Sequence, residues 1–199
     1  MHAMVVDGVI LAAGWSSRTA PEVKLGYPIA GRSLLEMSIS SLRPFCARLY
    51  VVTGAHQFAV MELLRGQDTL TPVYNPDFAA GMYGSVKAGL RCTEASAAFV
   101  LPGDCPFASP EVMEALLACQ DDVVLPCWKG QTGHPVLLRR RAIGEVLKDN
   151  SCQSLREFVR QHGHTGVPVD CPGILMDIDT PEDYRQALNR REAVAMWKP

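Results

Sequence analysis

The segment that follows the first apolar run of this sequence has the residue types needed to hold an anion. The run Val9–Leu11 leads into the small residues Ala12–Gly14, and two cations, Arg18 and Lys24, come after them. Backbone N–H groups can approach phosphate oxygens closely where side chains are small, and the cations supply charge. The segment therefore predicts a triphosphate-binding loop that matches neither a Walker A loop nor a G-x-G-x-x-G fingerprint. A solvated loop with two surface cations is the alternative.

Three aspartates offer oxygen ligands for a metal ion. Asp104 follows the apolar run Ala98–Pro102, and Asp177 and Asp179 precede a helix start near the end of the chain. Mg²⁺ prefers hard oxygen ligands, often one or two carboxylates together with substrate phosphates. Because side chains two apart on a strand point the same way, we expect Asp177 and Asp179 to face Asp104 together. The alternatives are a turn aspartate at position 104 and, for Asp179, stabilisation of the following helix N-terminus.

Two further segments predict contacts with substrates. Within Asn75–Val86, Gly84 permits close backbone approach and Ser85 offers a hydroxyl near a helix start, which suits recognition of a nucleobase edge. A glycine-broken connection is the alternative. His134 is a candidate for binding a second substrate, or a turn residue held beside proline. We find no Ser/His/Asp or Cys/His pattern, so we expect Cys105 to pack structurally rather than act as a nucleophile.

Composition narrows the class of protein and of partner. With 199 residues, 48% hydrophobic and 20% charged, the chain suits one domain spanning 1–199 with its core at about 7–190. A net charge of −2 gives no electrostatic case for nucleic acid or anionic membranes as partners. No signal peptide or membrane span is evident. The seven cysteines form no C-x-x-C pair, which favours reduced thiols and a cytoplasmic location.

The elements that must position these residues alternate between apolar runs and helical periodicity. We expect strands at Val9–Ala13, Leu49–Thr53, Thr71–Tyr74, Ala98–Pro102, Val123–Pro126, Pro135–Leu138 and Leu175–Ile178. We expect helices at Ser33–Leu42, His56–Arg65, Gly84–Arg91, Pro110–Cys119, Arg139–Leu147, Ser154–His162 and Pro181–Arg190. This order predicts an α/β fold: a single-domain, doubly wound, mainly parallel sheet with helices on both faces. In such sheets ligands bind at the carboxyl ends of the strands.

Taken in order, six motifs between Asp7 and Leu188 resemble those of nucleotidyltransferases with a Rossmann-like, glycosyltransferase-A type fold, and most of all those of molybdenum cofactor cytidylyltransferases. These motifs are Leu11-Ala12-Ala13-Gly14-x-Ser16-x-Arg18 with Lys24, Val52-Thr53-Gly54, Asn75 with Gly81-Met82-x-Gly84-Ser85, Gly103-Asp104-x-Pro106, Gly133-His134-Pro135 and Asp177-Ile178-Asp179-Thr180-Pro181-Glu182. The family's segment facing the second substrate is replaced by Asp149–Arg156. The resemblance implies a nucleotide-diphospho-sugar transferase-like fold.

The resemblance also implies a reaction, in which CMP passes from CTP to the phosphate of the molybdopterin cofactor with Mg²⁺ as cofactor and pyrophosphate as leaving group. It implies catalytic roles for Arg18, Lys24 and Asp104, and metal binding by Asp104, Asp177 and Asp179. It implies acceptor binding by His134 and nucleotide binding by Leu11, Ala12, Ala13, Gly14, Thr53, Gly54, Gly84, Ser85 and Asp104. A molybdenum hydroxylase apo-enzyme is a further expected partner. The alternatives are guanylyl or other nucleotidyl transfer to another phosphorylated acceptor, and a non-catalytic cofactor chaperone.

Overall fold

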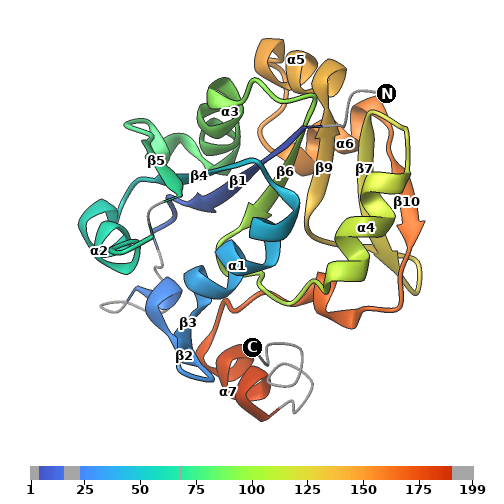
Figure 1. The fold of residues 1–199 in the computed structure, drawn as a ribbon. Helices are drawn as coiled ribbons and strands as arrows, with labels where there is room; N and C mark the ends of the chain where they lie inside the picture. The colour runs from blue at the N-terminus through green and yellow to red at the C-terminus, as the bar shows by residue number, and fades with distance from the viewer. Residues whose placement is uncertain (1–4, 16–22, 68, 190–199) are drawn as a thin grey trace.

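The fold is built around a twisted central sheet (Figure 1). The computed structural model describes residues 5–15, 23–67 and 69–189. Seven strands of its eight-stranded sheet run in the order β10-β7-β9-β6-β1-β4-β5, and β8 pairs with β7. The strands are β1 Val6–Ala12, β4 Arg48–Thr53, β5 Leu70–Tyr74, β6 Ala97–Pro102, β7 Val123–Trp128, β8 Gln131–Thr132, β9 Val136–Arg139 and β10 Thr165–Pro168.

The sheet is mainly parallel, as the sequence predicts. β1 pairs in parallel with β4 and β6, β4 pairs in parallel with β5, and β10 pairs in parallel with β7. β9 breaks the pattern, because it pairs antiparallel with both β6 and β7. The carboxyl ends of β1, β4, β5 and β6 therefore meet at one edge, where ligands of α/β proteins bind.

Helices cover both faces of the sheet, because successive side chains of a buried strand point to opposite sides. Ile10 and Ala12 of β1 join one core cluster with α1, α2 and α4, whereas Val9 and Leu11 join a second cluster with α3, α5 and α6. Figure 1 shows α1 and α4 in front of the sheet. The helices are α1 Leu34–Leu42, α2 Gln57–Leu63, α3 Met82–Cys92, α4 Pro110–Ala118, α5 Arg140–Lys148, α6 Leu155–His162 and α7 Pro181–Asn189.

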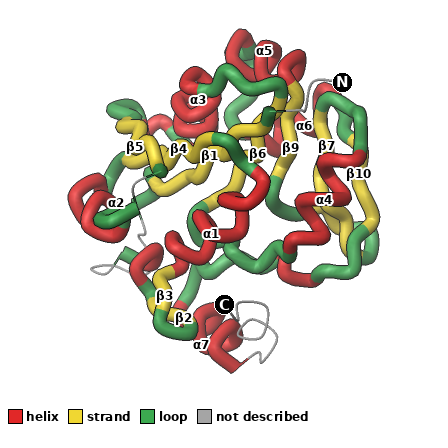
Figure 2. Tube along the Cα trace, viewed as in Figure 1, coloured by secondary structure: helices red, strands yellow, loops and turns green. Residues whose placement is uncertain are grey.

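A small third cluster ties the last helix to a hairpin outside the main sheet. The hairpin consists of β2 Pro28–Ile29 and β3 Arg32–Ser33, which pair antiparallel. Ile29 and Ile178 are fully buried in this cluster with Ala187 of α7. The Tyr184 hydroxyl donates a hydrogen bond to the Pro28 carbonyl (2.5 Å). Figure 2 shows α7 beside this hairpin, away from the centre of the sheet.

One predicted strand is wrong. Leu175–Ile178 forms no strand: residues Pro172–Leu175 form a 3-10 helix, and the following residues up to 179 are irregular. The run is apolar because Leu175 packs against one core cluster whereas Met176 and Ile178 pack in another. An apolar run does not by itself distinguish a strand from other buried segments. The sheet instead gains β10, in which alternate residues are exposed. Within the described residues, the helices are too short or too polar to cross a membrane.

Candidate active site

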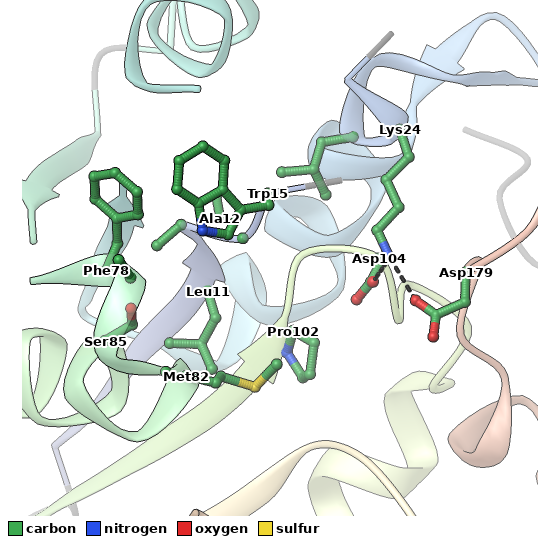
Figure 3. A pocket seen from close by; sticks show the side chains of 15 residues that line it. Leu11, Ala12, Trp15, Lys24, Phe78, Met82, Ser85, Pro102, Asp104 and Asp179 are labelled. Atoms are coloured by element: carbon green, nitrogen blue, oxygen red, sulfur yellow. Dashed lines mark hydrogen bonds and ion pairs between the residues drawn. The ribbon is translucent and has the colours of Figure 1, made fainter. Parts of the chain in front are cut away.

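A cavity of about 370 Å³ opens at the carboxyl ends of β1 and β6 (Figure 3). The described part of the first loop forms one wall, and the start of α3 forms another. Lys24 and two carboxylates close the third side. The lining residues are Leu11, Ala12, Ala13, Gly14, Trp15, Lys24, Leu25, Phe78, Ala79, Gly81, Met82, Ser85, Pro102, Asp104 and Asp179.

One ammonium group joins two carboxylates that lie far apart in the sequence. Lys24 Nζ lies 2.5 Å from Asp104 Oδ2 and 2.6 Å from Asp179 Oδ1. Figure 3 shows the Lys24 side chain pointing toward these two aspartates. The side chains of Lys24 and Asp104 are only 14% and 16% exposed. Burial lowers the pKa of Lys24, but the charges and hydrogen bonds of both aspartates together outweigh it and raise that pKa. Lys24 therefore stays charged, and both carboxylates are aimed at one cation position.

Backbone contacts hold the two carboxylates in place. Asp104 follows β6, where the N–H of Gly103 donates to the Leu11 carbonyl (2.9 Å) and the Ser38 hydroxyl donates to the Gly103 carbonyl (2.9 Å). The Ile178 N–H donates to the Asp104 carbonyl (3.2 Å), which draws the segment before α7 to the same place. The site therefore depends on β6 pairing with β1 and on the segment before α7 lying against the loop after β6.

The start of α7 is fixed by the capping that its sequence predicts. Asp183 Oδ2 accepts from the Thr180 N–H (2.7 Å), and the Asp183 N–H donates to the Thr180 hydroxyl (3.2 Å). The Asp179 N–H also donates to Asp183 Oδ2 (3.2 Å). Asp179 is thus oriented by the helix start, and its Oδ1 contacts Lys24 Nζ.

The far wall of the cavity is aromatic and tied to the loop after β5. Trp15 is 58% exposed and meets Phe78 edge to face, with ring centroids 5.2 Å apart. Asn75 Nδ2 donates to the Ser85 hydroxyl (3.0 Å), which fixes Ser85 at the start of α3. The wall can therefore offer a planar surface beside a small polar group.

A second, larger cavity of about 920 Å³ lies beside the segments that contain Asp104 and Asp179. It is lined by Cys105 and Asp177, which are close in sequence to Asp104 and Asp179 of the first cavity. Arg156 and Arg160, one turn apart on α6, add positive charge to its wall. The remaining lining residues are Leu125, Gln131, Thr132, Gly133, His134, Val136, Leu155, Val159, Gly163, His164, Ile174, Leu175 and Met176.

His134 lines this second cavity and has a buried ring nitrogen that lacks a partner among the described residues. Its N–H donates to the Ile174 carbonyl (2.9 Å), and its peptide bond to Pro135 is cis. Among the described residues, the buried Nδ1 of His134 has no hydrogen-bond partner. Burial lowers the pKa of His134, Asp104 opposes that shift and Arg156 adds to it, so the imidazole is neutral near pH 7. In a neutral imidazole one ring nitrogen donates a hydrogen bond and the other accepts one, so Nδ1 can form one hydrogen bond with a ligand.

Most of the residues predicted from the sequence line these two cavities. Leu11, Ala12, Ala13, Gly14, Lys24, Ser85, Asp104 and Asp179 line the first cavity, and Asp177 and His134 line the second. Thr53, Gly54 and Gly84 line neither. Thr53 is buried, and its carbonyl accepts from the Asn75 N–H (2.9 Å). Arg18 lies outside the described residues.

The expected orientation of Asp177 needs correction. The reasoning that Asp177 and Asp179 point the same way assumed a strand, and these residues form none. Asp177 lines the second cavity, where burial and the charges of Asp179 and Asp104 raise its pKa. Over residues 5–15, 23–67 and 69–189, no three His, Cys, Asp or Glu side chains are grouped as a metal site. Asp104 and Asp179 both contact the one ammonium group of Lys24.

The structure adds residues that the sequence reasoning did not assign. Phe78 and Met82 line the first cavity, and both stand in the predicted segment Asn75–Val86. Arg156 and Arg160 occupy the polar face of an amphipathic helix, a pattern that is usually an ordinary solvated face. Burial, with Asp104 and Asp177, raises the pKa of the Cys105 thiol well above its usual range, which suits its expected packing role.

With this geometry established, comparison with known proteins decides the family. Residues 8–166 match the family model described as the MobA-like NTP transferase domain. The chain belongs to this family. It is therefore a nucleotidyltransferase, and the first cavity lies where such α/β proteins bind ligands.

Individual members of the nucleotidyltransferase group resemble the chain over nearly its whole length. The chain is 30% identical, over 93% of its length and 96% of the other protein, to the molybdenum cofactor cytidylyltransferase of Escherichia coli strain K12. It is 24% identical, over 92% of its length and 94% of the other protein, to the molybdenum cofactor guanylyltransferase of Mesorhizobium japonicum. The crystal structure of Rv0371C of Mycobacterium tuberculosis H37Rv in complex with manganese has a TM-score of 0.77 at 22% identity and covers 94% of this chain and 99% of that one.

Proposed function

We propose that this enzyme transfers CMP from CTP to the phosphate of the molybdopterin cofactor and releases pyrophosphate. The observation that carries the proposal is that two short segments, residues 104–105 and residues 177–179, each contribute lining residues to both cavities. Asp104 and Asp179 line the first, whereas their near neighbours Cys105 and Asp177 line the second. A nucleotide in the first cavity and a phosphorylated acceptor in the second would meet beside Asp104.

The carboxylates of Asp104 and Asp179 fit a divalent metal. Their oxygens lie within 2.6 Å of a single cation, Lys24 Nζ, so one small ion can contact both. Mg²⁺ takes carboxylate and phosphate oxygens at about 2.0–2.1 Å. When bound there, it would polarise the α-phosphate and neutralise charge on the triphosphate. The manganese complex of Rv0371C from M. tuberculosis supports a divalent ion in this fold.

The other residues of the first cavity have roles in holding the nucleotide. Lys24 and Arg18 would hold the triphosphate and stabilise the departing pyrophosphate by charge. Backbone groups of Ala12 and Ala13, with the Ser85 hydroxyl, would contact the cytosine. Trp15, being largely exposed at the cavity wall, could pack against its ring.

The chemistry requires no covalent enzyme intermediate. An oxygen of the acceptor's phosphate attacks the α-phosphorus of CTP, and the bond from that phosphorus to the bridging oxygen of the β-phosphate breaks. The electron pair of that bond leaves with pyrophosphate, so atoms and charge balance. The chain contributes positioning and charge neutralisation.

Pyrophosphate release in the presence of molybdopterin tests the proposed function. We expect release with CTP and Mg²⁺, and much slower release with GTP, ATP or UTP, because the cytidylyl relative has the higher identity. Fast release with GTP instead would favour guanylyl transfer. This is the second candidate function, because the chain is also similar to the M. japonicum guanylyltransferase. CTP binding without release, for every acceptor offered, would contradict the proposal and favour a cofactor chaperone.

Removing the two arginines of α6 should weaken binding of the acceptor. We expect Arg156→Ala/Arg160→Ala to raise the KM for molybdopterin at least tenfold and to leave the Kd for CTP unchanged. The reason is that both side chains line the second cavity, where an anionic acceptor gains charge-assisted hydrogen bonds. Steady-state kinetics with varied acceptor and calorimetry with CTP measure the two effects. Arg91→Ala, an exposed arginine that lines neither cavity, is the matched control.

A further inference from the structure

We propose that Lys24 occupies the metal position in the nucleotide-free enzyme, so that a divalent cation binds well only after nucleotide phosphates draw Lys24 away. This inference rests on the proposed function, because it assumes that Asp104 and Asp179 hold the metal. It adds that binding of the metal depends on binding of the nucleotide. The enzyme would then not hold a catalytic metal without its substrate.

The geometry of the three side chains carries the proposal. Lys24 Nζ lies 2.5 Å from Asp104 Oδ2 and 2.6 Å from Asp179 Oδ1, so its ammonium stands between the oxygens that a metal would use. An ammonium group and a divalent ion cannot share that position, and their like charges repel strongly at such a distance. Lysine and metal therefore compete for the same two carboxylates.

Other contacts hold the backbone near Lys24 and near Asp179. Lys24 stands just before the β2–β3 hairpin and Asp179 just before α7, and these two elements are joined by the Tyr184–Pro28 hydrogen bond and by packing of Tyr27 on Tyr184. The backbone on both sides is thus held, while the four-carbon stem of Lys24 can turn. The triphosphate of a nucleotide in the first cavity offers the departing ammonium a stronger anionic partner.

Coupling follows from this exchange. A nucleotide that binds Lys24 removes its ammonium from the two carboxylates and raises metal affinity, and by linkage the metal raises nucleotide affinity by the same factor. Without nucleotide, the metal must displace a charged and mostly buried lysine, and the free energy of that displacement weakens metal binding. The wild-type protein should accordingly bind a divalent ion weakly in the absence of CTP.

Binding of Mn²⁺ alone tests the proposal without any turnover. We would titrate Mn²⁺ into wild type, Lys24→Met and Lys24→Gln without nucleotide and count free Mn²⁺ by electron paramagnetic resonance. We expect both variants to bind one Mn²⁺ at least tenfold more tightly than wild type. Lys148→Met, which removes an exposed lysine lining neither cavity, should match wild type. Adding Asp104→Asn to Lys24→Met should abolish the gain.

The outcomes separate this inference from the proposed function. Adding non-reacting CTP analogue should tighten Mn²⁺ binding to wild type far more than to Lys24→Met. If the Lys24 variants bind Mn²⁺ no more tightly than wild type while the analogue still recruits Mn²⁺ to wild type, competition is disproved and the proposed function stands. If none of the proteins binds Mn²⁺ even with the analogue, the metal assignment fails, and this inference fails with it.

Discussion

Replacement of Asp104 by alanine should lower kcat/KM for nucleotidyl transfer by about a thousandfold or more. Loss of a metal-holding carboxylate removes several kcal/mol of transition-state stabilisation, and about 4 kcal/mol corresponds to a factor of about 10³. Asp104 Oδ2 is 2.5 Å from the cation position, and Asp179 by itself would have to hold the metal in the variant. Pyrophosphate release at saturating CTP, acceptor and Mg²⁺ measures the effect.

The fold should survive this substitution, which makes the result interpretable. The backbone of Asp104 keeps its hydrogen bond from the Ile178 N–H, and Lys24 still contacts Asp179. Thermal unfolding followed by circular dichroism checks this. Asp170→Ala, an exposed aspartate that lines neither cavity, controls for loss of one negative charge. Near wild-type turnover by Asp104→Ala would refute the metal assignment.

Gly133→Ala should destabilise the protein by about 3 kcal/mol, the upper end of what overpacking usually costs. A methyl group at position 133 would lie 2.1 Å from the carbonyl oxygen of Ile174 and 2.6 Å from its carbonyl carbon. The obstacle is backbone, so no side-chain rotation relieves the clash. The segment containing Ile174 also leads to Asp177 and Asp179, so activity should fall together with stability. Urea unfolding monitored by fluorescence measures the free energy of unfolding.

A second glycine provides the control for that prediction. Gly144 lies within α5, and a methyl group there would meet no atom within 4 Å. Alanine is a better helix former than glycine by about 0.8–1.0 kcal/mol, so Gly144→Ala should stabilise the protein. The same chemical change is thus expected to have opposite signs at the two positions. A Gly133→Ala protein as stable as wild type would contradict the close approach of residues 133 and 174.

Local patterns in the sequence were sufficient to predict most elements and several site residues. The apolar runs that became β1, β4, β6, β7 and β9 predict buried strands, because strands covered on both faces are apolar throughout. The predicted strand Thr71–Tyr74 corresponds to β5, a largely exposed strand at the edge of the sheet. The Thr180-Pro181 start of α7 is capped as its residues indicate. The small residues after the first run and Asp104 after another line one cavity, because the carboxyl ends of parallel strands share an edge.

The tertiary structure decided what depends on distant contacts. Nothing local distinguishes Leu175–Ile178 from a strand, and its irregular backbone results from packing of Ile174 and Ile178 into separate clusters. The same packing directs Asp177 to one cavity and Asp179 to another. The strand order, with antiparallel β9 between β6 and β7, is likewise a matter of long-range pairing.

The chain by itself therefore determined which residue types stand at the ends of its strands, since that depends on short-range periodicity and turn chemistry. Only the folded structure determined that Lys24 lies between Asp104 and Asp179, the latter 155 positions away. The physical reason is that this contact requires β6, the β2–β3 hairpin and α7 to pack together. The free energy of that packing comes from burial of side chains such as Ile29 and Ile178 against one another, which short-range patterns do not encode.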